Sequence, residues 1–251
     1  MTKHISIAID GPSGAGKSTL ARKIAKRFGF LYVDTGAIYR TVALHAIREK
    51  IDLKDAAALL DALNSLRVEL SYGENGFQHM RLNGKDVTAQ IRTPEVSMAA
   101  STVSAYPGVR VFLLETQRQF ARENDVVMDG RDIGTMVLPN ADLKVFLTAS
   151  PEERAWRRTL ELDQKGMPRP YQEVLEDQRK RDYNDANREI APLRQAEDAV
   201  LLDTTHMTLS QSEEALEDLI IERTGRRPLQ ERPESEDAKA AQELGREMTG
   251  V

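Results

Sequence analysis

The sequence predicts an α/β fold in which helices flank a parallel sheet, with a small antiparallel insert. Three observations support this. An apolar run near the N-terminus passes through a glycine-rich loop into an amphipathic helix, further short apolar runs alternate with helical periodicity, and the stretch 63–104 carries hairpin signals instead. Because strands that alternate with helices form parallel sheets, we expect ligands to bind at the carboxyl ends of the strands.

The glycine-rich loop follows the apolar run 5–9 directly and fits the pattern G-x-x-x-x-G-K-[ST]. Its glycines let backbone N–H groups face a phosphate, and the next helix adds its positive end. Lys17 can reach the β and γ phosphates, and the Ser18 hydroxyl can bind Mg²⁺. The alternative is a glycine-rich turn without a ligand. We expect a nucleoside triphosphate to bind the loop, which comprises Gly11, Pro12, Ser13, Gly14, Ala15, Gly16, Lys17, Ser18 and Thr19.

The helix after the loop is predicted by Leu20, Ile24 and Phe28, which recur every four residues and form one apolar stripe. Gly29 is placed to end it. A short strand is expected over 31–33. Helices are then expected over about 37–50 and 54–66.

The pattern changes between residues 63 and 104. The segments 68–72 and 77–82 have the composition of strands, and Asn83-Gly84 is a strong hairpin dipeptide. Local antiparallel pairing inside an alternating chain indicates an insertion. We therefore expect an inserted subdomain over 63–104, between core segments 1–62 and 105–224.

The second half of the core returns to alternation. Ser150 begins a helix as its N-cap, with Pro151 at the first helical position and Glu153 at the third. From Gly225 onward the chain lacks aromatic residues, so 225–251 is expected to be a disordered tail, with room for a short helix near 237–248. The other expected elements are a helix over 108–122, strands over 126–128 and 143–147, a helix ending at 165–168, a polar helix over 171–188, a strand over 199–202 and a helix over 210–223.

Composition excludes several functions. The 251 residues are 40% hydrophobic and contain no cysteine, which removes disulfides, thiolate metal sites and cysteine nucleophiles. A formal net charge of −5 argues against general nucleic-acid binding. The chain has neither an apolar run of membrane-spanning length nor room for a cleavable signal, so we expect a cytoplasmic protein without a membrane partner. The scattered histidines are interpreted as structural: His4, His45, His79 and His206.

Polar residues at the ends of the predicted elements indicate a second anionic ligand. Asp129 ends a buried strand, where an acid can hold Mg²⁺ directly or through water, although it could instead be a loop acid or helix cap. Arginine forks bind phosphate bidentately, although any one could be ordinary surface or a structural salt bridge. The guanine-reading N-K-x-D motif is absent. The arginines concerned are Arg40, Arg110, Arg131, those of 181–188, and Arg154, Arg157 and Arg158 on one helix.

These motifs in this order resemble the cytidylate kinases, the (d)CMP kinases of the nucleoside monophosphate kinase family of P-loop kinases. The resemblance covers about residues 1–222. Together the blocks are specific to that family, whereas the glycine-rich loop alone is not. The blocks are 10–17, 34–40, 91–96, 100–101, 109–110, 129–135, 181–182 with Asp185 and Arg188, and 191–193.

The resemblance implies a role for each matching residue. Arg40 and Arg131 would hold the acceptor phosphate, and Arg181 and Asp185 the sugar. The insert would be the monophosphate-binding domain, about 151–170 the lid, and the protein a monomer. The lid arginines Arg154, Arg157 and Arg158 would close over the transferring group. The cytosine would be read by Ser101, Arg110, Asp132 and Arg188, with Thr35 and Tyr39 completing the acceptor site.

The expected reaction is transfer of the ATP γ-phosphoryl group to CMP or dCMP, with Mg²⁺ and without a general base. A carboxylate can accept from the amino group of cytosine, whereas in uracil it would face a carbonyl oxygen, so Asp132 is suited to the discrimination. Two alternatives stay open. One is a P-loop kinase for another small acceptor, such as shikimate, gluconate or a different nucleotide. The other is a nucleotide-binding regulatory module.

Overall fold

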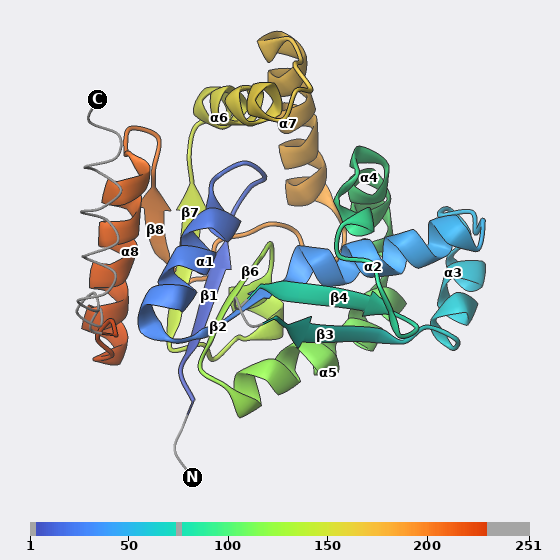
Figure 1. Ribbon diagram of the computed structural model, residues 1–251, viewed down its shortest axis with the longest axis horizontal. Helices are drawn as coiled ribbons and strands as arrows, with labels where there is room; N and C mark the ends of the chain where they lie inside the picture. The colour runs from blue at the N-terminus through green and yellow to red at the C-terminus, as the bar shows by residue number, and fades with distance from the viewer. Residues whose placement is uncertain (1–3, 74–76, 230–251) are drawn as a thin grey trace, which may run out of the picture.

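The central sheet is parallel throughout and carries the glycine-rich loop at its carboxyl edge. The computed structural model describes residues 4–73 and 77–229. The sheet has five strands in the order β2-β6-β1-β7-β8 (Figure 1). The predicted fold class is confirmed. The strands are β1 (Ser6–Asp10), β2 (Leu31–Asp34), β6 (Val126–Gly130), β7 (Leu143–Thr148) and β8 (Val200–Asp203).

Two hydrophobic cores cover the two faces of this sheet. Helices α1 (Lys17–Phe28) and α8 (Leu209–Thr224) pack on one face, where Ile7 and Ile9 of β1 point. Ala8, between them, belongs to the opposite core. This is the alternation of a strand buried on both faces. The second core is formed with α2 (Thr35–Arg48), α5 (Pro107–Glu123) and the insert.

Helix α1 has the apolar stripe that the sequence predicted. Leu20, Ile24 and Phe28 are buried, and Gly29 ends the helix in the left-handed conformation with φ 70°. Helix α2 starts two residues earlier than expected because the Asp34 side chain accepts from the Ala37 N–H and caps its first turn. The strand therefore passes into the helix without a loop.

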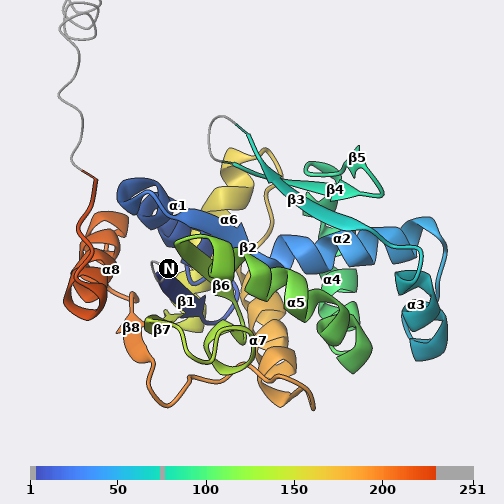
Figure 2. The same ribbon diagram turned by 90° about the horizontal axis from the view of Figure 1, so that it is seen from below.

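The insert contains a three-stranded antiparallel sheet in the order β3-β4-β5 (Figure 2). Asn83 and Gly84 turn β4 into β5 with φ values of 49° and 79°, as the hairpin dipeptide predicted. Figure 2 places this sheet and α3 at the opposite end of the molecule from α8. The elements of this region are α3 (Ala56–Leu63), β3 (Val68–Tyr72), β4 (Gln78–Leu82), β5 (Lys85–Asp86), a 3₁₀ turn (Gln90–Arg92) and α4 (Pro94–Val103).

The sequence analysis missed α4 and the π-helical turn Ile133–Val137. Helix α4 begins with Thr93 as its N-cap and Pro94 at its first position, followed by Glu95. The cap and the proline repeat two parts of the start signal that correctly predicted α6, so α4 could have been found. The π-helical turn has no such local signal.

Helices α6 (Pro151–Gln164) and α7 (Tyr171–Asn187) form a separate small cluster through Ala155, Leu162 and Val174. The Ser150 hydroxyl accepts from the Glu153 N–H at 3.1 Å, which confirms the predicted cap. Figure 1 shows the two helices at the top, over the loop between β1 and α1.

The described chain continues past α8 along the core. Gly225 ends the helix with φ 69°, the Leu229 N–H donates to the Arg27 carbonyl at 2.8 Å, and Arg226 pairs with Asp125. The remainder of the expected tail, including the stretch 237–248 for which the sequence allows a short helix, lies outside the described residues. Within residues 4–73 and 77–229, no helix has the length and apolarity to cross a membrane.

Gly11 marks the closest approach of the glycine-rich loop to the sheet. Its φ is +149°, and a Cβ there would lie 1.9 Å from the Leu147 carbonyl oxygen in β7. Both groups belong to the backbone, so neither can rotate away. Only glycine lets β1 pass into the loop at this point.

We expect Gly11→Ala to lower the free energy of unfolding by about 1–3 kcal/mol, because the added methyl group must displace a strand. Urea denaturation measures this. Gly108→Ala is the control, since its Cβ would meet only the end of the exposed, flexible Leu60 side chain. That variant should be neutral or stabilising by up to about 1 kcal/mol. Equal effects of the two substitutions would contradict the interpretation.

Candidate active site

The glycine-rich loop buries a lysine. Lys17 begins α1 with only 5% of its surface exposed, and its ammonium donates to the Pro12 carbonyl at 2.7 Å. Burial, with Arg131 nearby, lowers the pKa of Lys17 to about 7. A cation held in this way is stabilised when an anion enters the loop beside it.

Asp129 lies directly beside Ser18, as a metal site in a P-loop requires. The Ser18 hydroxyl donates to Asp129 Oδ2 at 2.7 Å and the Tyr32 hydroxyl to Oδ1 at 2.9 Å. Burial raises the pKa of Asp129, with Asp34 adding to the rise. A buried carboxylate beside a hydroxyl provides the hard oxygen donors that Mg²⁺ prefers. The residues present therefore fit the expected metal.

Asp10 organises the turn that follows β6, a role that the sequence analysis did not assign. Its Oδ1 accepts from the Ile133 N–H at 2.8 Å and its Oδ2 from the Gly134 N–H at 2.7 Å. Burial raises the pKa of Asp10 to about 6. Because Arg131 and Asp132 lie just before this turn, Asp10 fixes the backbone position from which their side chains extend.

The carboxyl edge of the sheet carries a cavity of about 320 Å³, which we call the inner cavity. It is lined by Lys17, Ser18 and Asp129 on one side and by α4 on the other. The structure brings every residue predicted to bind the acceptor to this one cavity: Thr35, Tyr39, Arg40, Ser101, Arg110, Arg131, Asp132, Arg181, Asp185 and Arg188.

Asp132 is the centre of a buried charge cluster. It is 4% exposed, pairs with Arg110, and lies 3.8 Å from the Arg188 guanidinium. The Arg110 guanidinium also lies over the Tyr39 ring, 5.5 Å from its centroid. Burial lowers the pKa of Arg188, and its Nη2 has no hydrogen-bond partner in the described structure. One buried carboxylate thus faces two arginines, one of which has unused donors.

The other arginines differ in how fully they are paired. Arg131 Nε donates to Asp185 at 2.8 Å, and Arg40 Nη2 donates to Asp34 at 2.9 Å. Arg181 is exposed, and within the described part of the chain no ion pair holds it. The Thr35 hydroxyl donates to the Asp129 carbonyl at 2.7 Å, so Thr35 joins α2 to β6 as well as lining the cavity.

The three predicted lid arginines occupy different places. Arg154 is 2% exposed, where it donates to the Ser13 carbonyl at 2.9 Å and to Asp182 at 2.6 Å. Arg157 donates to the Thr204 carbonyl at 2.7 Å. Of the three, only Arg158 lines a described cavity, where it pairs with Glu161 at 2.6 Å. Arg154 therefore bridges the glycine-rich loop to α7, a link that the sequence analysis did not predict.

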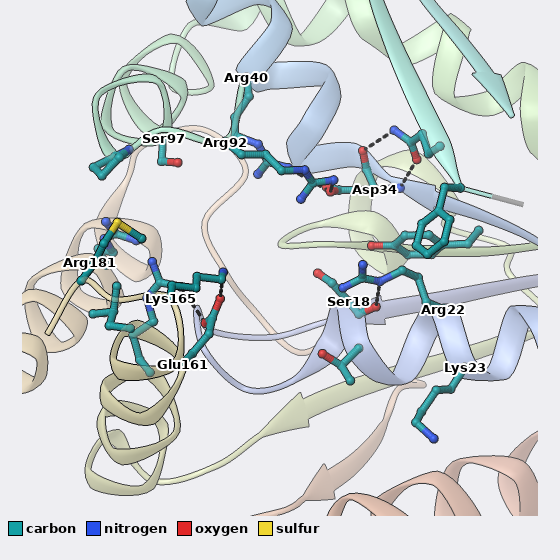
Figure 3. Close-up of a pocket in the computed structure, with 18 of the residues that line it drawn as sticks. Ser18, Arg22, Lys23, Asp34, Arg40, Arg92, Ser97, Glu161, Lys165 and Arg181 are labelled. Atoms are coloured by element: carbon teal, nitrogen blue, oxygen red, sulfur yellow. Dashed lines mark hydrogen bonds and ion pairs between the residues drawn. The ribbon is translucent and has the colours of Figure 1, made fainter. Parts of the chain in front are cut away.

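A larger groove of about 1050 Å³ opens beside the inner cavity, between α1, the insert, α6 and α7 (Figure 3). Arg181, Lys165 and Glu161 face it from the α6–α7 side, and Arg22 faces it from α1. Arg92 reaches it from the insert, 4.0 Å from Asp34. The sequence analysis assigned no role to Arg22, Lys165 or Arg92. None of the four histidines lines the inner cavity or this groove.

Comparison with known proteins gives one consistent family. The family model described as cytidylate kinase matches residues 7–225. A cytidylate kinase of Exiguobacterium sp. is 50% identical over 222 residues, which is 88% of this chain and 99% of that protein. A cytidylate kinase of Caldicellulosiruptor bescii is 49% identical over 209 residues, covering 83% and 92%. The structure of a gluconokinase from Sinorhizobium meliloti covers 90% of this chain and 97% of its own, at 17% identity and a TM-score of 0.43.

We expect the affinity for ATP to depend on the protonation of Lys17. As the pH rises through about 7, the free protein loses this proton, whereas the phosphate-bound protein keeps it. Affinity should therefore be highest below pH 7 and fall by at most about tenfold per pH unit above it. Titration calorimetry from pH 6 to 9 at constant ionic strength measures this.

The matched control is Lys17→Gln, which leaves the titration of ATP itself unchanged. The difference between the two curves isolates the lysine. If the curves for the native protein and the variant ran parallel across this pH range, the interpretation of Lys17 would be wrong.

Proposed function

The chain belongs to the cytidylate kinase family, and from this premise we propose that it transfers the γ-phosphoryl group of ATP to CMP or dCMP through the residues around the inner cavity. The observation that carries the proposal is the convergence on that cavity of the buried Asp132 cluster and the lysine of the glycine-rich loop. A site with this many cations in a chain of net charge −5 suits two anionic ligands.

The donor binds the loop from Gly11 to Thr19. Its backbone N–H groups and Lys17 hold the β and γ phosphates, and the burial of Lys17 strengthens that attraction by excluding water. Ser18 and Asp129, the latter directly or through water, would hold Mg²⁺, which would supply neutralisation of the phosphate charge.

The acceptor phosphate lies between Arg40 and Arg131. Each arginine is tethered to a carboxylate, Arg40 to Asp34 and Arg131 to Asp185, so its position is set before substrate arrives. Arg40 Nε is buried without a partner in the described structure, which leaves a donor for a phosphate oxygen. The acceptor phosphate is already anionic, so no general base is required. Catalysis comes from positioning and charge stabilisation.

The base of the acceptor is read at the Asp132 cluster. The carboxylate accepts from the amino group of cytosine, while Arg110, Arg188 and Ser101 supply donors for N3 and O2. The unused Nη2 of Arg188 supports this, because a buried donor favours a partner. Arg181 and Asp185 hold the sugar at the mouth of the cavity.

The helices α6 and α7 close over the transferring group and exclude water. Arg158 faces the open groove and contributes charge directly on closure. Arg154 and Arg157 contribute indirectly, through their hydrogen bonds to the Ser13 and Thr204 carbonyls. Because Ser13 belongs to the glycine-rich loop, movement of α6 on closure also changes the shape of that loop.

We also propose that the insert over 63–104 is the monophosphate-binding domain and that the protein acts as a monomer in the cytoplasm.

The test is ADP release by the purified protein with ATP and Mg²⁺, comparing CMP, dCMP, UMP, AMP, shikimate and gluconate as acceptors. Strong stimulation by CMP and dCMP alone supports the proposal. Stimulation by another acceptor would keep the donor site and overturn the assigned base contacts. ATP binding without stimulation by any acceptor would favour a regulatory module.

We expect Asp132→Asn to lower kcat/KM for CMP by about 100-fold and for UMP by much less, because the buried site loses its charged acceptor. The ratio of the two kcat/KM values should narrow by about tenfold or more. Asp163→Asn is the control, since Asp163 is exposed on α6 and lines neither cavity. An unchanged CMP-to-UMP ratio in a folded variant would mean that the base is read elsewhere.

A further inference from the structure

The outer edge of β2 is closed by two side chains of the insert rather than by another strand. β2 is the last strand on its side of the described sheet and pairs only with β6. The Tyr72 hydroxyl donates to the Tyr32 carbonyl at 2.8 Å. Gln78 accepts from the Asp34 N–H at 2.7 Å and donates to the Asp34 carbonyl at 3.2 Å. Tyr32 and Asp34 are two residues apart in the strand, so the backbone N–H and C=O groups of both face this same edge.

Gln78 imitates a neighbouring strand. Its amide makes the same pair of hydrogen bonds with Asp34 that a facing residue of a strand would make, and it is only 8% exposed. The Gln78 amide nitrogen also lies 3.1 Å from the sulfur of Met80, two residues along β4, and this contact fixes the orientation of the Gln78 side chain. Two buried backbone groups of Asp34 thus depend on one side chain of the insert.

The residue that Gln78 holds, Asp34, places Arg40, the arginine assigned to the acceptor phosphate, and lies near Arg92. Asp34 Oδ1 accepts from the Ala37 N–H at 2.8 Å, and Oδ2 accepts from Arg40 at 2.9 Å. Arg92 of the insert lies 4.0 Å from the same oxygen. Figure 3 shows Asp34 close to both guanidinium groups at the side of the groove. Movement of the Asp34 backbone would therefore move Arg40 and change how Arg92 is held.

We propose that Gln78 is a positioning residue for the acceptor phosphate, acting through Asp34 on Arg40 and Arg92. This inference rests on the proposed function, since it assigns Arg40 to that phosphate. Tyr72 has a different part. Its hydroxyl bonds to Tyr32 and not to Asp34, so it fixes the insert against the sheet without contact with the arginine cluster.

The experiment compares steady-state kinetics of the native protein, Gln78→Met and Tyr72→Phe, varying CMP and ATP separately. Gln78→Met keeps a long side chain but removes both hydrogen bonds to Asp34. It should raise KM for CMP by about tenfold, the effect of a lost buried hydrogen-bond pair. KM for ATP should stay within about twofold, because the glycine-rich loop is untouched. Tyr72→Phe, which loosens the insert elsewhere, should change KM for CMP by less than about threefold.

A second variant tests the hydrogen-bond pattern itself. In Gln78→Glu the carboxylate still accepts from the Asp34 N–H but repels the Asp34 carbonyl when it is ionised. Position 78 is buried and lies beside Asp34, so the pKa of the introduced carboxyl should lie above its ordinary value of about 4.3. Protonation restores a donor, so KM for CMP should improve toward the native value as the pH falls from 8 to 5, relative to the native protein over the same range. Loss of packing alone would not give this pH dependence, and the readout stands even if Gln78→Met fails to fold.

The proposal is overturned if Gln78→Met and Tyr72→Phe raise KM for CMP equally, if KM for ATP rises in parallel, or if Gln78→Glu follows the native pH profile. A native protein that does not turn over CMP would contradict the proposed function and would remove this inference with it. Kinetics of the native protein, measured first, separate that failure from the other outcomes.

Discussion

Asp129 holds the active-site edge of the sheet together. Its carboxylate accepts from Ser18 at the start of α1 and from Tyr32 of β2, and its carbonyl accepts from Thr35 at the start of α2. The parallel register places it beside Ile9 of β1 and Asp34 of β2. A carboxylate this buried is costly without partners. Its hydrogen bonds therefore fix the relative positions of the glycine-rich loop, the central strands and α2.

The charges of the site are arranged in pairs that leave room for phosphate. Asp132, Asp185, Asp34 and Asp182 each hold an arginine. These pairs limit the cost of burying cations and fix the guanidinium planes in advance. Donors nevertheless remain on Arg40 and Arg188. Substrate anions can use those donors without breaking the pairs, which is the preorganisation that phosphoryl transfer depends on.

The insert shares the hydrophobic core of α2 and α5, whereas α6 and α7 form a small cluster of their own. Both parts are also joined to β2 or to the glycine-rich loop by side chains that bond to backbone groups. Gln78 and Tyr72 join the insert to β2, and Arg154 joins α6 to the glycine-rich loop at Ser13. Both parts surround the same groove. In the proposed mechanism, the residues that hold the acceptor and the donor are thus attached to the same elements that would exclude water.

The sequence by itself determined the parallel α/β fold, the glycine-rich loop and the hairpin, because each has a local pattern: a stripe of apolar residues, fixed glycine spacing or an Asn-Gly turn. Through the resemblance of its blocks to the family, it also indicated ten acceptor residues that line the inner cavity, although not Ser97, Met98 or Ser104. It assigned no role to Asp10, Gln78 or Asp182, whose partners lie 123, 44 and 28 residues away in the chain. Nor did it distinguish the buried Arg154 from the groove-facing Arg158 on the same helix. Only the tertiary structure decided these, because burial and hydrogen bonding between distant segments depend on how the elements pack and leave no periodic trace in the sequence.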